Sequence, residues 1–235
     1  KIAPLLKQCC LCVSIAKGLD EAGQTAAQIF HDVFSGKQDY ALLYGPMIAE
    51  EICSDRYAFA QLGCDTVACY HRIYGLFSET RLYLEHTTDI TGITWSVILK
   101  NVYAMIFGMA DELQLGDNTR GLLTVKALTE LGQIVYKMGG RKNSSYRLAG
   151  LGDLVTTATS EDSHHHELGR MLARGELEYI EGEGVHTLAM IMKHRLIEVE
   201  HYPLMQLIDN IIVKPAYVRE SIQQYLTNSF PLSPE

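Results

Sequence analysis

Short apolar runs alternate with helical patterns over the first third of the chain. Four such runs end near turn residues and predict buried strands: Leu11–Ala16, Ala41–Tyr44, Ala58–Cys64 and Arg81–Glu85. Between them, apolar residues recur at helical spacing over residues 26–33 and 67–77. Pro46 suits the first position of a helix that runs toward Ile52. This alternation of strands and helices predicts a mainly parallel α/β sheet.

The pattern changes after His86, where helical periodicity replaces the short runs. Apolar residues recur on one helix face over residues 102–109, and again over residues 128–138 before the stop signal Gly139-Gly140. Helical patterns continue over residues 188–196 and 204–213. We therefore expect an α/β part followed by an all-α domain, with the boundary near residues 86–90, which gives residues 1–88 and residues 89–235.

Composition and charge narrow the class of protein. The 235 residues are 47% hydrophobic and 20% charged, as in an ordinary globular protein, and the net charge of -8 argues against a nucleic-acid partner. We find neither a signal peptide nor an apolar run of membrane-spanning length, so no membrane span is expected. The six cysteines all lie in apolar surroundings in the first third of the chain, with no His-rich segment at zinc-site spacing, which indicates reduced, mostly buried thiols of a cytoplasmic protein. Because the chain begins at Lys1, we expect a fragment whose beginning was lost.

Three polar residues in apolar or glycine-rich surroundings are candidates for chemistry. Lys100 follows Val97, Ile98 and Leu99, and it is either a lysine that snorkels out of its helix or a partly buried ammonium that gives a proton to a carbonyl oxygen. Asp153, after two glycines, is either a helix N-cap or the partner of Lys100. Lys17 follows a predicted strand, where α/β sheets bind ligands, or is a solvated loop lysine.

Six motifs, in this order and spacing, resemble NAD(P)-dependent glycerol-3-phosphate dehydrogenases. They are A-K-G-L at 16–19, G-P-x-x-A-E-E at 45–51, L-K-N-V at 99–102, L-G-D-N-T-R at 115–120, A-G-L-G-D-L-V at 149–155 and E-G-V-x-T at 183–187. The A-G-L-G-D-L and L-G-D-N-T blocks are the most specific to that family. The chain contains no G-x-G-x-x-G, and its α/β part is too small for a complete dinucleotide-binding domain.

The resemblance implies an oxidoreductase that interconverts dihydroxyacetone phosphate and sn-glycerol 3-phosphate with NAD or NADP and feeds phospholipid synthesis in the cytoplasm. It makes residues 1–88 a partial Rossmann-like domain and residues 89–235 the helical substrate and catalytic domain. Lys100 would be the catalytic proton donor, oriented by Asp153. The other residues that match family positions are Lys17, Asn101 and Thr157 for the substrate, and Lys17 and Glu183 for the cofactor. No metal is implied.

Three positions depart from the family pattern. Tyr44 stands where the family usually has Ser, and Ser96-Val97 stands where it has two glycines, so that two Cβ atoms would crowd the cofactor. The run of His164, His165 and His166 replaces an Arg-Asn-Arg that grips the substrate phosphate, at a cost of about 3 kcal/mol.

The histidine run has several interpretations. His164 and His165 are substrate-binding candidates, and protonated imidazole would restore part of the lost affinity at mildly acid pH. A metal site and a solvated helix start are the alternatives, although three adjacent histidines seldom point one way.

Two other hypotheses compete with the enzyme. One is a degenerate, inactive relative whose helical domain serves oligomerisation or regulation, which the missing glycines and the histidine run favour. The other is a dehydrogenase of another 2-hydroxy or 3-hydroxy acid, which fits the loss of a phosphate clamp. The retained polar set favours glycerol-3-phosphate dehydrogenase. The choice between NAD and NADP and the existence of a homodimer stay open.

Overall fold

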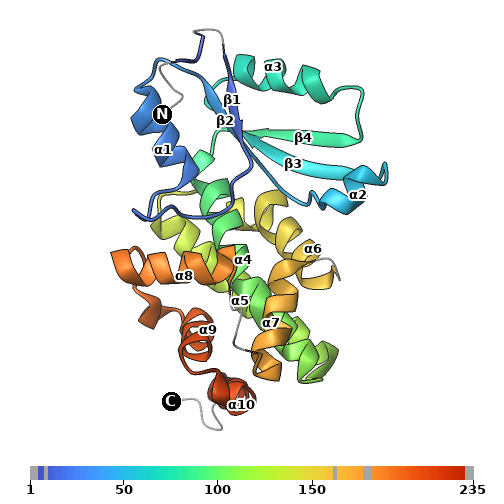
Figure 1. Ribbon diagram of the computed structural model, residues 1–235, viewed down its shortest axis with the longest axis vertical. Coiled ribbons are helices and arrows are strands. Elements are labelled where there is room, and N and C mark those ends of the chain that lie inside the picture. Colours follow the sequence, from blue (N-terminus) through green and yellow to red (C-terminus); the bar gives the residue numbers. More distant parts are fainter. Residues whose placement is uncertain (1–4, 8–9, 161–162, 177–180, 231–235) are drawn as a thin grey trace.

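The computed structural model describes residues 5–7, 10–160, 163–176 and 181–230, and the strands of this part all lie before residue 88 (Figure 1). The elements before residue 88 are β1 (Cys12–Ser14), α1 (Ala26–Phe34), β2 (Tyr40–Tyr44), α2 (Ala49–Cys53), β3 (Ala58–Gly63), α3 (Val67–Phe77) and β4 (Leu82–Thr87). The strand order in the sheet is β1-β2-β3-β4. The β1–β2 and β3–β4 pairs are parallel, whereas β2 and β3 are antiparallel, with Leu42 opposite Gly63.

The two faces of the sheet serve different cores because side chains alternate along each strand. Ala41 and Leu43 of β2 belong to a small core with Ile73 of α3. Leu42 and Tyr44 point to the opposite face and belong to the large core of the helical part. The sheet is thus held between α3 and the long helix α4 (Ile90–Glu112), in the upper part of Figure 1.

The segment that follows β2 differs from its prediction. A helix was expected from Pro46 to Ile52, but α2 begins only at Ala49. Phe59 donates its main-chain N–H to the Pro46 oxygen at 3.2 Å, so residues after β2 continue beside β3 in extended form. Gly45, with φ +156°, lies against this strand, and a Cβ there would overlap the main-chain oxygen of Phe59. Pairing with β3 therefore outweighed the preference of proline for a helix start.

After β4 the chain is helical throughout its described residues. The elements are α4, α5 (Gly116–Lys137), a 3-10 turn (Ser144–Tyr146), a π turn (Leu148–Gly152), α6 (Asp153–Thr159), α7 (His164–Arg174), α8 (Glu183–His194), a 3-10 turn (Val199–His201), α9 (Pro203–Val213), a 3-10 turn (Pro215–Tyr217) and α10 (Val218–Asn228). The expected fold class, an α/β part followed by an all-α part, is confirmed, and the change falls between the end of β4 and the start of α4. Periodicity gave no prediction of α6, α7 and α10.

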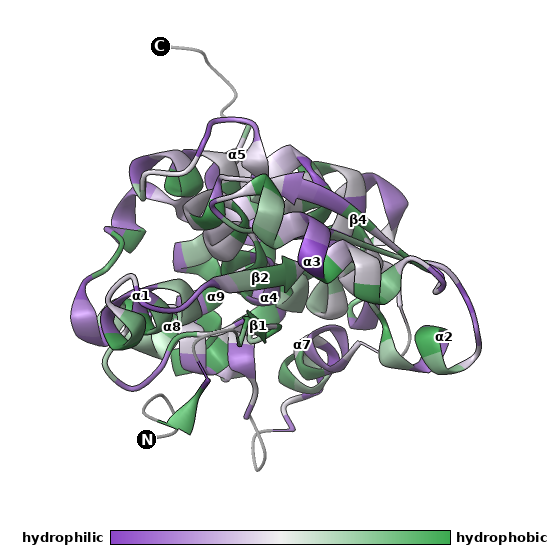
Figure 2. Cartoon of the chain, turned by 90° about the horizontal axis from the view of Figure 1, so that it is seen from above, coloured by the Kyte–Doolittle hydropathy of each residue, from purple (hydrophilic) through white to green (hydrophobic). Residues whose placement is uncertain are grey.

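Helix α4 is the axis of the helical part. Every residue from Gly92 to Ala110 is buried, because α5, α6, α7 and α8 pack around it (Figure 1). Figure 2 shows hydrophobic residues gathered along β2 and the helices under it. Asp89 caps the helix, accepting from the Gly92 N–H at 3.1 Å and the Arg141 N–H at 2.8 Å. A helix that is apolar all round is typical of a protein core.

The same helix corrects one expectation from the sequence. Ile90–Glu112 is long and apolar enough to cross a membrane by length and composition, although we found no apolar run of that length. The most apolar window of α4 is 89% buried inside the protein, and the core helix of a soluble protein passes the same test.

The cysteines also differ in part from their prediction. Cys10, Cys12, Cys53, Cys64 and Cys69 are free thiols, but only Cys64 and Cys69 are buried, so "mostly buried" was wrong. Cys9 lies outside the described residues.

Glycines set how closely α7 and α8 approach α4. A Cβ on Gly108 of α4 would overlap the His166 oxygen, and a Cβ on Gly169 of α7 would overlap the Met105 oxygen. The two helices therefore cross with their backbones in contact. Gly184, in the first turn of α8, lies in the same way against the Asn101 oxygen, where a Cβ would come within 2.6 Å. The contact of Gly184 brings the first turn of α8 to the middle of α4, where Lys100 and Asn101 lie, and α7 crosses α4 further along, at Met105 and Gly108.

Candidate active site

Lys100 is a buried lysine in the middle of α4. Its side chain is about 5% exposed, so it does not snorkel to solvent, and that interpretation was wrong. Its Nζ donates to Thr157 Oγ1 at 2.6 Å and lies 3.3 Å from Asp153 Oδ2. Both partners come from α6, one helical turn apart, and therefore face α4 together. Thr157 in turn donates to the Asp153 main-chain oxygen at 2.7 Å, which fixes its hydroxyl.

Asp153 shares one carboxylate oxygen between two lysines. Its Oδ2 lies 2.9 Å from Lys17 Nζ and 3.3 Å from Lys100 Nζ. The N-cap position of α6 belongs to Gly152, so Asp153 is not the cap that we weighed as its simpler role. The chain reaches this point through a tight turn in which a Cβ on Gly150 would overlap the Ser145 oxygen. Gly150 thus allows the close backbone approach that precedes Asp153, whereas a Cβ on Gly152 would meet its neighbours only at 3.6 Å or more.

Asn101 joins the loop after β1 to the start of α8. Its Nδ2 donates to the Lys17 oxygen at 3.3 Å and to Glu183 Oε2 at 3.1 Å. Among the described residues, its buried Oδ1 has no hydrogen-bond partner. Buried acceptors without a partner are rare in proteins, so this oxygen is suited to accept a hydrogen bond from a ligand.

The electrostatics of the cluster follow from burial. The pKa of Lys100 is lowered to about 8, chiefly by burial and also by nearby Lys17, while Asp153 and Glu183 act in the opposite direction. Two ammonium groups on one carboxylate leave an excess positive charge beside the pocket. In a partly dehydrated site, such an excess attracts an anion and stabilises negative charge on oxygen.

The three histidines at the start of α7 point in different directions. His166 is buried, with its Nε2 2.7 Å from Asp111 Oδ2, whose other oxygen binds Arg120. His164 is exposed, and its Nε2 lies 3.2 Å from the Glu181 oxygen. The described residues contain no group of three or more His, Cys, Asp or Glu that could hold a metal ion. The interpretation as a solvated helix start therefore holds only for His164.

His165 lines the pocket. Its Nδ1 is buried and has no partner among the described residues. The pKa of His165 is lowered to about 3, chiefly by burial and also by the charges of Lys100, His164 and Lys17. This lowered pKa argues against a protonated His165 that restores phosphate affinity at mildly acid pH.

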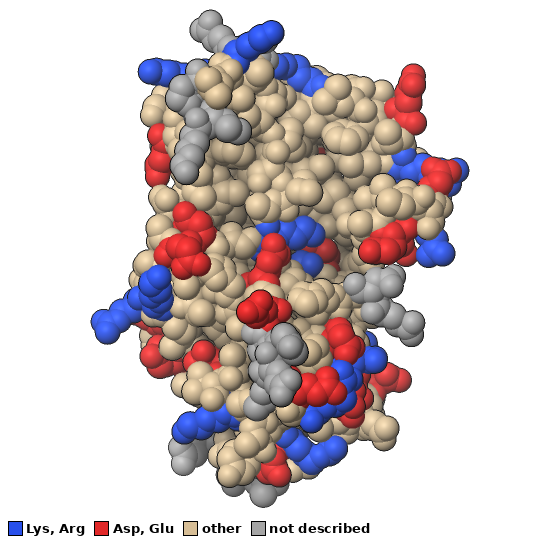
Figure 3. Space-filling view, in the orientation of Figure 1, with Lys and Arg blue, Asp and Glu red and all other residues tan. Residues whose placement is uncertain are grey.

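Two hollows lie at the segment that carries Lys17, one lined by Lys17 and the other by its neighbours Ala16 and Gly18. One, of about 170 Å³, is lined by Lys17, Met47, Ile48, Lys100, Asp153, Thr157, Ser160, Ser163, His164 and His165. The other, of about 640 Å³, lies between residues 16–29 and the start of α8, and its lining includes Glu183 and His186. Figure 3 shows blue and red side chains meeting midway between the α/β part and the helical part. Ser96 and Val97 are buried in α4, and neither is among the described residues that line these hollows.

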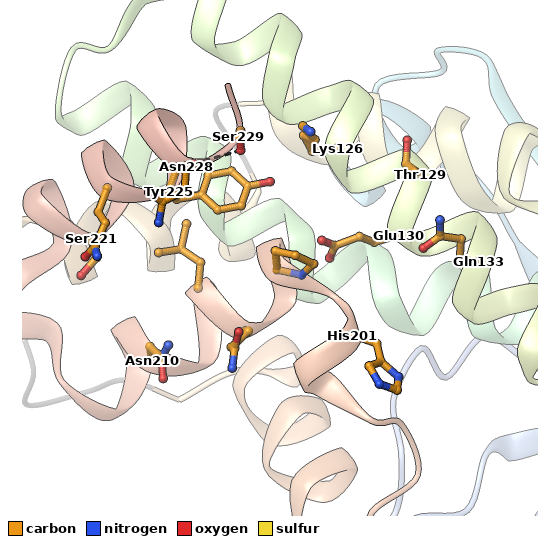
Figure 4. A pocket seen from close by; sticks show the side chains of 14 residues that line it. Lys126, Thr129, Glu130, Gln133, His201, Asn210, Ser221, Tyr225, Asn228 and Ser229 are labelled. Carbon is orange, nitrogen blue, oxygen red and sulfur yellow. Dashed lines mark hydrogen bonds between the residues drawn. The ribbon is translucent and has the colours of Figure 1, made fainter. Parts of the chain in front are cut away.

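A larger pocket, of about 810 Å³, lies elsewhere, between α5, α9 and α10 (Figure 4). Its buried carboxylate, Glu130, accepts from the Tyr103 hydroxyl at 2.9 Å and from the Leu204 and Met205 N–H groups at 2.6 and 3.0 Å. These donors are fixed parts of the fold, so Glu130 joins α4, α5 and the start of α9. We assign it a structural role.

The structure brings the sequence candidates into one cluster but also shows residues that sequence reasoning missed. Ser163 is the N-cap of α7 and lines the smaller hollow. Tyr44 and His186 hold the main chain on either side of Lys17, at the Ala16 and Leu19 oxygens. The only signal for any of them was that Tyr44 stands where a Ser was expected, because side-chain contacts to distant carbonyl groups leave no local pattern.

Comparison with known proteins gives a consistent result. Residues 89–223 match the family described as NAD-dependent glycerol-3-phosphate dehydrogenase C-terminus. A Mycobacterium avium protein named glycerol-3-phosphate dehydrogenase [NAD(P)+] is 36% identical over 165 residues, which are 70% of this chain and 48% of that protein. A Salinibacter ruber protein named glycerol-3-phosphate dehydrogenase [NAD(P)+] 2 is 29% identical over 97% of this chain and 70% of its own length.

Solved structures agree with the fold. The glycerol-3-phosphate dehydrogenase of Coxiella burnetii matches with a TM-score of 0.84 and 24% identity, over 96% of this chain and 71% of that one. The Plasmodium falciparum glycerol-3-phosphate dehydrogenase matches with a TM-score of 0.80 and 14% identity, over 94% of this chain and 66% of that one. The chain spans about half the length of the curated relatives that it matches first.

Proposed function

The chain belongs to the NAD-dependent glycerol-3-phosphate dehydrogenase family, and from this premise we propose that its cleft interconverts dihydroxyacetone phosphate and sn-glycerol 3-phosphate with NAD or NADP. The observation that carries the proposal is the pairing of one buried carboxylate, Asp153, with two ammonium groups, Lys17 and Lys100. A protein with a purely structural role gains nothing from these three charged side chains, because removing charges from water costs free energy.

Lys100 is the proposed proton donor. Hydride addition to the ketone carbon builds negative charge on the carbonyl oxygen, and a proton from the Lys100 ammonium converts that oxygen to the hydroxyl of the product. Lys100 is left as a neutral amine, which burial favours. A pKa of about 8 suits this exchange, because a general acid works best when its pKa lies near the working pH.

The neighbours of Lys100 have supporting roles in this proposal. Asp153 and Thr157 orient the Lys100 ammonium through the contacts at 3.3 and 2.6 Å. Lys17 faces the same hollow and balances the charge of the substrate. The phosphate would lie at the first turn of α7, beside His164 and His165, because a helix N-terminus presents free N–H groups to an anion.

The cofactor supplies the hydride when it is bound. The residues of this chain suit the nicotinamide end of the cofactor but not its pyrophosphate. The free Oδ1 of Asn101 and the 640 Å³ hollow beside Glu183 suit the nicotinamide end. The sequence has no G-x-G-x-x-G to cradle the pyrophosphate. We therefore expect Asn101 and Glu183 to contact the cofactor and the affinity of this chain for NADH to be weak.

The remaining features of the function are proposals as well. Residues 1–88 act as a partial dinucleotide-binding domain and residues 89–235 as the catalytic domain. The protein works in the cytoplasm on a small phosphorylated substrate. The runner-up, an inactive relative, is favoured by the histidines at 164–166 and by the lack of a Gly-rich loop.

The deciding experiment separates binding from turnover. The chain is titrated with dihydroxyacetone phosphate by calorimetry, and NADH oxidation is then followed with millimolar NADH, to offset the weak cofactor site. Saturable binding together with ketone-dependent oxidation supports the enzyme. Binding without turnover points to the inactive relative, and the absence of binding contradicts the proposed substrate.

A further inference from the structure

The main-chain turn that carries Lys17 is held at its carbonyl groups by side chains from three elements. Tyr44 of β2 donates its hydroxyl to the Ala16 oxygen at 2.7 Å. Asn101 of α4 donates to the Lys17 oxygen at 3.3 Å. The Nε2 of His186, on α8, lies 3.0 Å from the Leu19 oxygen and must carry a proton, because a carbonyl group can only accept.

This turn needs such support because regular structure ends before it. β1 ends at Ser14, so the Ala16 and Lys17 carbonyl groups lie beyond its pairing with β2, and only Leu19, in an isolated bridge with Thr25, pairs again within the turn. A loop lysine has a flexible side chain, and holding its ammonium in one place costs entropy that a loose backbone would increase. Lys17 nevertheless places its Nζ 2.9 Å from Asp153, a residue 136 positions away in the sequence.

The Tyr44 hydroxyl reaches the Ala16 oxygen from inside the large core. Its side chain is fully buried between the sheet and the helical part, so its hydroxyl must find a partner inside the protein. That partner is the Ala16 carbonyl, directly before Lys17. His186 acts from the opposite side, at the wall of the 640 Å³ hollow.

We propose that Tyr44 and His186 are positioning residues that hold the 16–19 turn and thereby aim the Lys17 ammonium into the cleft. Neither touches the proposed reacting atoms. Their effect on the substrate rests on the proposed function, whereas their effect on Lys17 itself does not.

The test compares two buried tyrosine hydroxyls. Tyr44→Phe removes the contact to the Ala16 oxygen, and the matched control Tyr103→Phe removes an equally buried hydroxyl that binds Glu130. The rate at which an amine-reactive reagent modifies Lys17 is measured by peptide mass spectrometry. We expect Tyr44→Phe to raise this rate about three- to tenfold, the usual effect of one lost hydrogen bond, and Tyr103→Phe to leave it unchanged.

His186 provides the second arm. His186→Ala is expected to raise the Lys17 modification rate by a similar factor, and His186→Gln, whose amide N–H can still reach the Leu19 oxygen, to restore it. Unchanged labelling in Tyr44→Phe, an equal rise in Tyr103→Phe, or no rescue by Gln would overturn the proposal.

The substrate measurement is kept separate. If the wild-type chain binds dihydroxyacetone phosphate, Tyr44→Phe should raise KM about three- to tenfold with kcat nearly unchanged. A lowered kcat at constant KM would contradict a positioning role through Lys17. If the wild-type chain binds no dihydroxyacetone phosphate, the proposed function fails, while the labelling still decides whether Tyr44 and His186 position Lys17.

Discussion

Asp153 in the cleft and Glu130 between α5 and α9 are two equally enclosed carboxylates with opposite surroundings. Asp153 is 3% exposed and Glu130 is 6% exposed. Glu130 accepts hydrogen bonds from a tyrosine hydroxyl and two main-chain N–H groups, all fixed by the fold. Asp153 is held by two lysine ammonium groups, beside atoms that still lack a partner, such as Asn101 Oδ1 and His165 Nδ1.

The difference shows that the size of a pocket is a poor guide to chemistry in this protein. The hollow at Glu130 is about 810 Å³ and that at Asp153 about 170 Å³. In the larger one, the charge is already satisfied by neutral donors. Around the smaller one, charges of both signs and the unpartnered ring of His165 lie together, an arrangement that costs stability and is typical of a reactive site.

The largest expected effect concerns the buried lysine of the smaller hollow. Lys100→Met should lower the rate of dihydroxyacetone phosphate reduction by about 10²–10⁴, because no other group replaces the proton donor. Lys126→Met, at the wall of the larger pocket, is the matched control and should leave the rate unchanged. The measurement is NADH oxidation at high NADH. Near-normal turnover of Lys100→Met would remove this lysine from its proposed role.

The second prediction uses the pH dependence of the rate. Only protonated Lys100 can act as the acid, so the rate should fall as the pH rises through about 8. The charge of Asp153 raises the pKa of Lys100, against the larger effect of burial. Asp153→Asn should therefore move this fall to lower pH and reduce the rate at pH 8 by at least about tenfold. In Glu130→Gln the fall should stay in place, and a shift there would break the distinction between the two carboxylates.

Much of this arrangement, but not all of it, was predictable from the sequence. The strands of the α/β part and the long helices follow from residue periodicity, and the ordered motifs at Lys17, Lys100 and Asp153 gave residues that the fold brings together. The antiparallel pairing of β2 with β3 was not predictable, because pairing direction depends on tertiary contacts. Helix α7 was missed because most of its residues are polar and only a few, such as Leu168, Met171 and Leu172, give an apolar pattern.

The burial of individual side chains could not be predicted from the sequence either. The run around Lys100 fitted both a snorkelling lysine and a buried one, since the two differ only in what packs against α4. Glu130 drew no attention at all, because nothing near it in the sequence indicates that α9 begins on its carboxylate. The different directions of the three histidines depend on how α7 packs against Asp111 and the cleft.

The third prediction concerns stability. Glu130→Gln should lower the free energy of unfolding by about 1–3 kcal/mol, because one carboxylate oxygen becomes an NH₂ group that faces an N–H or O–H donor. Urea unfolding measures this loss, and affinity for dihydroxyacetone phosphate should not change. A large loss of affinity in this variant would mean that the larger pocket takes part in the reaction.

The pH dependence of stability tests whether the surroundings of Glu130 favour its neutral form. Burial raises the pKa of Glu130 above its ordinary value, despite three hydrogen bonds that lower it. The protonated form is thus favoured by folding, and the stability that this gives is present below the ordinary pKa and lost as the pH rises through the raised one. In Glu130→Gln this part of the pH dependence should vanish. Identical pH profiles of the two proteins in urea unfolding would contradict the raised pKa.

The smallest expected effect lies with His165, where the cleft differs most from its family. Since its pKa is lowered to about 3, His165 stays neutral from roughly pH 8 to pH 5 and adds no charge for an anion. Sulfate is a suitable probe because it keeps its charge over this range. In calorimetric titrations, wild type and His165→Asn should change their sulfate affinity with pH in parallel, within about twofold. The charges of Lys17, Lys100, Asp153 and His164 are common to both proteins, so they cancel in the comparison. If affinity rises on acidification in wild type but not in His165→Asn, then a protonated His165 binds the anion. Burial would in that case not keep His165 neutral at mildly acid pH.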